Sequence, residues 1–205
     1  MRVLTIETAT EACSVALFEG SELVDAHHEV LGRGHAERLV PMVERLPGKG
    51  RADQIRVSLG PGSFTGVRIG LAVARALGLA WQSEVRGYPT LALVAAIAKD
   101  CHASGDVTVC MNGGHGQWFV QNYEADGLPQ GDAASLVPDE AATGHVHPLI
   151  AGNRAQELAG LITSSPHDAL DTLPDARHVL HLSEKLLTAD LSPIYGRAPD
   201  AKLPA

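Results

Sequence analysis

The stretch Leu59–Trp81, LGPGSFTGVRIGLAVARALGLAW, most constrains what this chain can fold into, because it joins a glycine-rich turn to a long apolar segment. Pro61 fixes one backbone angle, whereas Gly60 and Gly62 permit angles that other residues avoid. The hydroxyl side chains that follow can accept hydrogen bonds from the free N–H groups of a first helical turn. The sequence therefore predicts a loop and then a helix that begins within Ser63–Gly66.

Side chains on this predicted helix follow one another at about 100° and so separate into two faces. One face is a stripe of small residues, namely Gly66, Gly70, Ala74 and Gly78. The other face is also apolar, and only two arginines interrupt it: Ile69, Ala72, Val73, Ala76, Leu79 and Ala80, with Arg68 and Arg75. A helix that is apolar nearly all round is normally buried on two sides. We therefore expect one face to pack closely on the chain's own sheet and the other to need a second domain or a second chain.

The bulk properties are those of an ordinary globular protein. The 205 residues include 45% hydrophobic and 20% charged residues, and they allow one domain or two small ones. The formal net charge of −8 argues against a protein that grips a nucleic-acid backbone by itself, because such binding needs lysine and arginine to neutralise phosphates. Any RNA would have to be held mainly by a partner.

The cysteines and the apolar runs predict a cytoplasmic location. Cys13, Cys101 and Cys110 form no CxxC pair and are odd in number, which fits a reducing compartment better than a disulfide framework. Only Val3–Ile6 precedes the first acid, so no signal-peptide core is expected. Two arginines interrupt the best membrane-span candidate, and we expect no contact with a membrane.

The first half of the chain predicts three strands, a helix, a strand, a helix, a strand and a helix. These elements are expected, in that order, at Val3–Ile6, Cys13–Phe18, Glu22–Val30, Gly34–Leu46, Ile55–Leu59, the helix described above, Val85–Tyr88 and Pro89–Ala98. This is the element order of one ribonuclease-H-like lobe. The pattern restarts near Ala103, and we expect two α/β lobes with ranges 1–103 and 104–205.

The second half echoes the first with shorter elements and looks like a reduced copy. Strands are expected at Val107–Met111, Trp118–Tyr123, Ser135–Val137 and His147–Ile150, and helices at Arg154–Thr163 and Asp175–Ala189. The tail Ser192–Ala205 has no periodicity and is expected to lie along the surface.

Two loops could hold phosphate. The glycine loop before the long helix lacks the Gly-Lys-Ser/Thr end of a P-loop, and close helix packing through Gly60, Gly62, Gly66, Gly70 and Ala74 explains its glycines better. Hydroxyls at Thr8, Thr10 and Ser14 either make local hydrogen bonds between two strands or are the remains of a phosphate loop. A facing loop at Met111–Gly116 is flexible but lacks the carboxylate that metal-assisted phosphoryl transfer needs.

The sequence predicts no metal site and no catalytic residue. The close histidine pairs are His27-His28, His145-x-His147 and His178-x-x-His181; none has the spacing of a helical HExxH site, and no clear carboxylate accompanies them. A GxSxG nucleophile elbow is also missing, and no cofactor is expected.

Surplus apolar surface on two helices is the feature that a lone domain leaves unexplained. In Gly34–Leu46, apolar residues recur at helical spacing: Leu39, Met42, Val43 and Leu46. Together with the far face of the long helix, this is what half of a helical interface looks like.

Three segments resemble the TsaB family, the dimerisation subunits of the bacterial machinery that makes threonylcarbamoyladenosine in tRNA. They are MRVLTIETATEACSVALF, GHAERLVPMVERL and LGPGSFTGVRIGLAVARALGLAW. The resemblance covers about the first hundred residues, and GPGSFTGVRIG is highly specific for the family. In the second half it is mainly carried by Pro193–Arg197, where the family often has Pro-x-Tyr-Leu-Arg.

The resemblance implies two ribonuclease-H-like lobes of the actin, Hsp70 and sugar-kinase superfamily. It also implies a non-catalytic scaffold that pairs with TsaD through its first two helices, with the ATPase TsaE joining and tRNA held only through the complex. The interface would then include Leu39, Met42, Val43, Leu46, Arg68, Ile69, Val73 and Arg75. The isolated chain could form a homodimer through the same helices.

Two departures bear on an independent ATP site. Glu7 stands where active phosphotransferases of this fold usually have aspartate, and Asn112-Gly113-Gly114 stands where TsaB proteins commonly show Asp-Ala-Arg. Both make such a site less expected. The alternative function is a small-molecule kinase or ATPase of the same superfamily, in which Thr8, Thr10 and Ser14 cradle phosphate.

Overall fold

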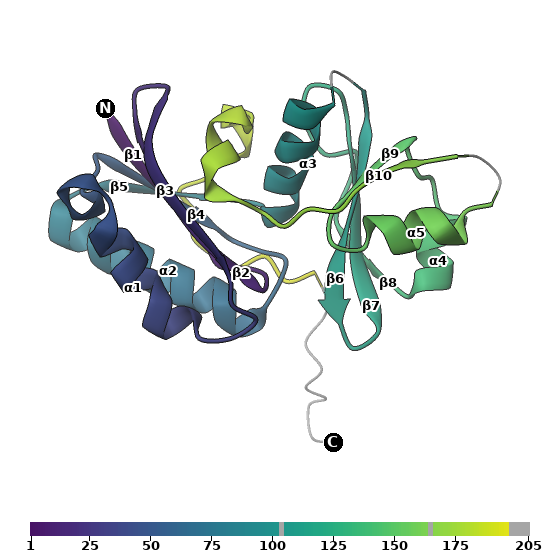
Figure 1. Cartoon of the computed structure of the whole chain (residues 1–205), viewed down its shortest axis with the longest axis horizontal. Helices are drawn as coiled ribbons and strands as arrows, with labels where there is room; N and C mark the ends of the chain where they lie inside the picture. The colour runs from purple at the N-terminus through teal and green to yellow at the C-terminus, as the bar shows by residue number, and fades with distance from the viewer. Residues whose placement is uncertain (103–104, 164–165, 197–205) are drawn as a thin grey trace.

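A computed structural model gives the structure of residues 1–102, 105–163 and 166–196, and it shows two lobes side by side (Figure 1). The first lobe is built on a five-stranded sheet in the order β3-β2-β1-β4-β5. Its strands are β1 (Arg2–Glu7), β2 (Ala12–Glu19), β3 (Glu22–Val30), β4 (Gln54–Ser58) and β5 (Glu84–Tyr88). The first three strands pair antiparallel, whereas β4 and β5 continue the sheet in parallel with β1.

The second lobe repeats this topology with shorter strands. Its sheet has the order β10-β9-β6-β7-β8, in which β6, β7 and β8 form the antiparallel meander and β9 and β10 add in parallel to β6. The strands are β6 (Val107–Gly114), β7 (Gln117–Tyr123), β8 (Ala134–Leu136), β9 (Leu149–Ala151) and β10 (Asp168–Leu170). The expectation of two ribonuclease-H-like lobes, the C-terminal one reduced, is confirmed.

Helices cover both outer faces of this pair of sheets. On the first sheet lie α1 (His35–Arg45), followed by the short 3-10 turn η1 (Pro47–Gly50), and α2 (Phe64–Trp81). On the second sheet lie α4 (Pro138–Thr143) and α5 (Ala155–Leu161), as Figure 1 shows. Buried apolar residues lie between each sheet and its outer helices. In the first lobe they come from β1, β2, β4, α1 and α2.

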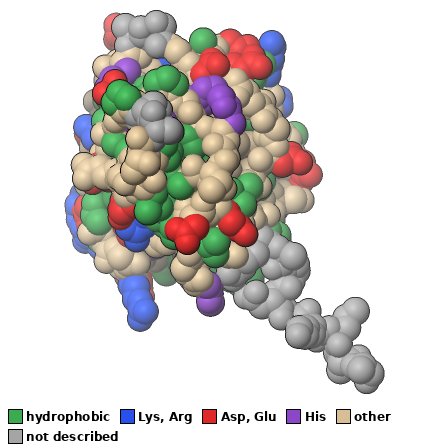
Figure 2. Space-filling model, turned by 90° about the vertical axis from the view of Figure 1, so that its right-hand side faces the viewer, with side chains coloured by type: hydrophobic (Ala, Val, Ile, Leu, Met, Phe, Trp, Pro, Cys, Tyr) green, Lys and Arg blue, Asp and Glu red, His purple; other side chains and the backbone are tan. Residues whose placement is uncertain are grey.

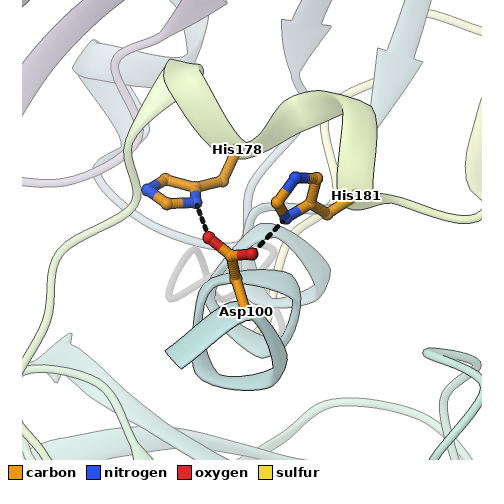
Figure 3. A group of neighbouring side chains, drawn as sticks. All are labelled: Asp100, His178 and His181. Atoms are coloured by element: carbon orange, nitrogen blue, oxygen red, sulfur yellow. Dashed lines mark ion pairs between the residues drawn. The ribbon is translucent and has the colours of Figure 1, made fainter. Parts of the chain in front are cut away.

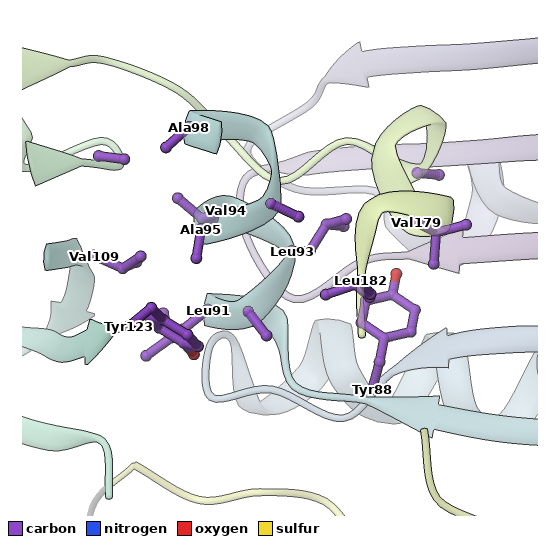
Figure 4. Close-up of a cluster of buried hydrophobic side chains, with 14 of the residues drawn as sticks. Tyr88, Leu91, Leu93, Val94, Ala95, Ala98, Val109, Tyr123, Val179 and Leu182 are labelled. Carbon is purple, nitrogen blue, oxygen red and sulfur yellow. The ribbon is translucent and has the colours of Figure 1, made fainter. Parts of the chain in front are cut away.

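A third layer lies between the two sheets and joins the lobes. Helix α3 (Thr90–Cys101) is buried from Thr90 to Ala98, so its apolar residues are covered on all sides. The 3-10 helix η2 (Ala176–His181) packs beside it, and Figure 4 shows Val179 and Leu182 facing Tyr88 and the residues of α3. Because this one core takes side chains from both sheets, the two lobes form a continuous hydrophobic interior.

The C-terminal part of the chain differs from the sequence prediction. No long helix forms at Asp175–Ala189; the segment makes η2, which packs on α3, and a second 3-10 turn, η3 (Glu184–Leu186). It then returns to the first lobe, where Gly87 and Thr188 exchange backbone hydrogen bonds of 2.8 and 3.0 Å. This segment therefore contacts the first lobe, although it follows the second sheet along the chain. The expected boundary at 103–104 and the tail beyond residue 196 lie outside the described residues.

Helix α2 begins and packs as the sequence predicts. Ser63 is its N-cap, and its side chain accepts a hydrogen bond from the N–H of Gly66 at 3.2 Å. In the described part of the chain, α2 is the one helix that is long and apolar enough, by length and composition alone, to cross a membrane. Its small-residue stripe is buried against the sheet, whereas the opposite side of the helix is exposed.

Candidate functional site

The site is centred on the N-terminal end of α2, where β1 and β4 both end. Since these strands are parallel, their carboxyl ends lie at the same edge of the sheet. The side chain of Thr8 donates a hydrogen bond to the carbonyl of Gly66 at 2.8 Å, and the N–H of Ser63 donates one to the carbonyl of Ala9 at 2.6 Å. These bonds fix the first turn of α2 directly against the β1–β2 turn.

The glycines of this region permit the close approach. A Cβ on Gly62 or Gly66 would lie 2.1 Å from a carbonyl oxygen of the β1–β2 turn, and one on Gly70 would lie 2.4 Å from the Thr8 hydroxyl oxygen. Gly60 has φ 93° and faces the carbonyl of Ile194. Ala74 is also fully buried. Atoms of the same chain thus fill the space around each of these residues.

The three candidate phosphate-loop hydroxyls all make internal hydrogen bonds. Thr8 donates to the carbonyl of Gly66 in α2, Thr10 accepts from the N–H of Ala12 at 3.2 Å, and Ser14 accepts from the N–H of Ala176 at 3.0 Å. Thr8 and Ser14 are fully buried. Only the bond of Thr10 is local, because Thr8 and Ser14 bond residues that are distant in the sequence, and Thr10 is the one of the three with partial exposure.

Glu7 is a carboxyl group buried at the end of β1. One of its oxygens accepts from the N–H of Ala9 at 2.7 Å, and the other accepts from the hydroxyl of Tyr88 at 3.3 Å. Desolvation by burial outweighs these bonds and raises the pKa of Glu7 to about 7. The same burial, together with the Glu7 charge, raises the pKa of Tyr88, so the phenol stays protonated as a donor. Glu7 is sealed from solvent and cannot reach a ligand from this position.

The structure corrects half of the predicted interface. Leu39, Met42, Val43 and Leu46 are buried in the chain's own core, each 4% exposed or less, because α1 packs this side on the first sheet. They offer no surface to a partner. Of the α2 residues, Ile69 and Val73 are half-buried, and Arg68 and Arg75 are exposed.

The exposed apolar surface lies instead on the outside of α2. Leu79 is 85% exposed, and three alanines and two half-buried aliphatic residues extend the surface along the helix at spacings of three and four. We call this surface the α2 outer face, and it comprises Ile69, Ala72, Val73, Ala76, Leu79 and Ala80. On α1, Val40 is 51% exposed.

The two arginines of α2 hold the chain's own C-terminal segment. Arg75 donates to the carbonyl of Leu191 at 3.0 Å, and Arg68 donates to the hydroxyl of Tyr195. The Arg68 guanidinium also lies over the ring of Phe64, at 3.2 Å from its centroid. Ile194 adds a backbone bond of 2.8 Å to the carbonyl of Leu59. The segment therefore borders the α2 outer face.

A pocket of about 750 Å³ lies between the lobes at the same end of α2. It is lined by the β1–β2 turn, the start of α2, the β6–β7 turn and the C-terminal segment, including Thr10, Glu11, Ser63, Asn112 and Tyr195. The two loops that sequence analysis paired thus face each other. The side-chain oxygen of Asn112 accepts a hydrogen bond from the N–H of Gly114 at 3.1 Å, and Glu11 accepts one from the side-chain amide of Asn153 at 2.8 Å.

A cluster of two histidines and an aspartate lies away from this pocket. Asp100 at the end of α3 faces His178 and His181 of η2, with an Nδ1–carboxylate distance of 3.4 Å for each histidine (Figure 3). Ligand atoms of all three lie within 4.8 Å of one another. Sequence analysis noted the histidine pair but missed the carboxylate, because Asp100 is distant along the chain. The expectation that no acid accompanies this pair is wrong.

Comparisons with known proteins give a consistent result. A family model described as TsaD, tRNA N6-adenosine threonylcarbamoyltransferase, matches residues 26–149. The tRNA threonylcarbamoyladenosine biosynthesis protein TsaB of Escherichia coli K12 is 35% identical over 167 residues, which are 78% of this chain and 68% of that protein. The protein of the same name in Haemophilus influenzae is 32% identical over 117 residues, which are 55% of this chain and 49% of that protein. These alignments thus span about half to two thirds of the curated relatives.

A solved structure matches nearly the whole chain. YeaZ from Pseudomonas aeruginosa superposes with a TM-score of 0.81 at 28% identity, and the match covers 95% of this chain and 99% of that one. The similarity thus extends through both lobes, including the reduced one.

Proposed function

The chain belongs to the TsaB family, and from this premise we propose that it is a non-catalytic subunit that pairs with TsaD through the α2 outer face. The family acts in biosynthesis of threonylcarbamoyladenosine in tRNA. The observation that carries the proposal is the exposure of Leu79 and its alanine neighbours on a helix whose opposite face is fully packed. Small side chains let a second helix approach closely, and an apolar face of this kind marks a protein interface.

In the proposed assembly TsaD supplies the chemistry and TsaE joins the pair. Two features favour a scaffold role for this chain: the Glu7 carboxyl is sealed inside the protein, and the hydroxyls of Thr8 and Ser14 are bonded internally. The same outer face would pair two copies of this chain when TsaD is missing. We place the assembly in the cytoplasm, where tRNA is modified.

Contact with tRNA is proposed to occur through the complex. The net charge of −8 opposes independent binding to a phosphate backbone. On the outer face of the second lobe, Figure 2 shows hydrophobic side chains in the middle and acidic and basic side chains mostly towards the margins. A basic groove along this face would be needed to hold RNA without a partner.

Glutamate on the α2 outer face is expected to separate pairing from folding. The variant Ala72→Glu/Ala76→Glu places two charges on exposed helical positions, so the free energy of unfolding should change by less than about 1 kcal/mol. Burying those charges against TsaD should weaken binding by at least about 100-fold. Affinity is measured by calorimetry with purified TsaD, and folding by urea denaturation.

The matched control is Gln156→Glu, which adds a charge to an exposed position of α5 on the other lobe. It should bind TsaD as the wild type does. Unchanged binding by the α2 variant would show that the chosen face is wrong. If the wild-type chain and TsaD form no mixed complex at micromolar concentrations in gel filtration, the pairing itself is refuted.

The pocket between the lobes favours a second candidate, a kinase or ATPase of the same superfamily. It brings Thr10 and the Asn112 turn to opposite walls of one space, as a phosphate site would require. Calorimetry with ATP and magnesium on the isolated chain distinguishes the two functions. Tight binding that is lost in Thr10→Val would favour the enzyme, whereas the scaffold proposal predicts no such binding.

A further inference from the structure

We infer that Asp100, His178 and His181 form a binding site for one divalent transition-metal ion, such as Zn²⁺, which ties η2 to the end of α3. This inference is independent of the proposed pairing with TsaD. The three side chains lie between the lobes but outside the pocket described above. Two imidazoles and one carboxylate, with a fourth position left for water, are a common set of zinc ligands in proteins.

The local fold places both histidines on one side of η2. A 3-10 helix has about three residues per turn, so side chains at positions i and i+3 lie one above the other. His178 and His181 have this spacing, and Figure 3 shows both rings directed from η2 towards Asp100. Their ring centroids are 5.8 Å apart with an edge-on arrangement. The rings therefore converge on the carboxylate from two directions and leave room between them.

The distances fit a shared ion better than direct hydrogen bonds. The Nδ1 atom of His178 lies 3.4 Å from Oδ2 of Asp100, and the Nδ1 atom of His181 lies 3.4 Å from Oδ1, both beyond the usual limit of about 3.2 Å for a hydrogen bond from nitrogen to oxygen. To ligate one ion together with both histidines, one of these oxygens would turn towards both rings. In a tetrahedral site with bonds of about 2.1 Å, neighbouring ligand atoms are about 3.4 Å apart. The ligand atoms lie within 4.8 Å of one another, so small side-chain rotations suffice to close the site.

The surroundings favour a cation and allow it to enter. His178 is one-quarter exposed, whereas the side chains of Asp100 and His181 are almost half exposed. The positive charge next to His178 is compensated, because Arg177 is held by Asp175 through a bond of 2.9 Å. Lys99, beside Asp100, donates instead to the carbonyl of Glu124.

Binding is tested with Zn²⁺ and Co²⁺ on the metal-free full-length chain. We expect one equivalent of Zn²⁺ in calorimetry, a higher thermal midpoint on loading, and the strong visible absorption of four-coordinate Co²⁺. His178→Ala and Asp100→Asn should each weaken Zn²⁺ binding by at least about 100-fold, since each removes one of three protein ligands. For comparison, replacing a residue that only hydrogen-bonds to a metal ligand lowers metal affinity by about 10- to 100-fold.

The control is His145→Ala, from the other edge-on histidine pair, in which the ring centroids are 4.7 Å apart. It should leave the affinity, the stoichiometry and the cobalt spectrum unchanged. Urea denaturation shows whether each variant is folded, so that lost binding is not confused with unfolding. Unchanged Zn²⁺ affinity in both ligand variants, or no saturable binding by the wild-type chain, would overturn the inference.

Discussion

Replacing Gly66 with alanine is expected to lower the free energy of unfolding by at least about 3 kcal/mol, and at 37 °C to leave little soluble protein. The added Cβ would lie 2.1 Å from the carbonyl oxygen of Thr8. That oxygen is part of the backbone and cannot rotate away as a side chain would. The first turn of α2 must therefore move away from β1, which breaks the 2.8 Å bond from the Thr8 hydroxyl.

The matched control is the same substitution at Gly160 in α5. A Cβ there meets nothing within 4 Å, and the backbone has an ordinary helical conformation. Alanine should stabilise this helix by about 0.5–1 kcal/mol, because glycine loses more conformational freedom on folding. Opposite effects of one substitution at two helical glycines, measured by urea denaturation, would isolate the contact with Thr8. A change below 1 kcal/mol at Gly66 would contradict the packing described here.

The packing of α2 could be predicted because its sequence leaves few alternatives. A stripe of small residues at helical spacing has no role in an exposed helix, so Gly66, Gly70, Ala74 and Gly78 predict close contact with another element. The structure confirms this contact with the sheet. The strands of the first lobe could be predicted in their order along the chain, since turn residues bound these short segments. The short strand β10 of the second lobe was not predicted.

The side of α1 that packs on the chain's own sheet could not be distinguished from an interface by its pattern. Leu39 and Met42 mark an apolar stripe, but a stripe that contacts the chain's own sheet has the same spacing as one that contacts another protein. The prediction of a helix at Asp175–Ala189 was wrong for a different reason. Residues 175–189 have helical spacing, yet they form only the short 3-10 turns η2 and η3, because apolar spacing alone does not show which segment becomes an α-helix. In the Asp100 cluster the histidine pair is visible in the sequence, but its contact with Asp100 is tertiary and leaves no local signal.

Glu7 shows how the site differs from that of an active phosphotransferase. A carboxyl group that holds magnesium must be ionised and open to the ligand. Here it is fully buried, bonded to the N–H of Ala9 and the hydroxyl of Tyr88, and its pKa is raised to about 7. The sequence showed the residue but not its burial, because the β1–β2 turn and Tyr88 close over it from distant parts of the chain.

This burial predicts that the contribution of Glu7 to the free energy of unfolding falls as pH rises from about 4.5 to about 7. In that range the unfolded chain releases the Glu7 proton, whose pKa is 4.5, whereas the native state retains it. The native state therefore loses about 3 kcal/mol from this group by pH 7, and the loss is complete above that pH. At pH 4 and below, both states hold the proton and the group costs nothing.

Glu7→Gln should remove this dependence and keep most of the contacts. The amide oxygen can accept from Ala9, and the Tyr88 hydroxyl can accept from the amide nitrogen. Urea denaturation between pH 4 and pH 8 should show that the free energy of unfolding of the variant increases by about 3 kcal/mol relative to that of the wild type as pH rises. Glu19→Gln, at an exposed site on β2, controls for the loss of one charge. Parallel curves for Glu7→Gln and the wild type would mean that Glu7 has the same pKa in the native and unfolded states. The sealed carboxyl would then no longer argue for a scaffold.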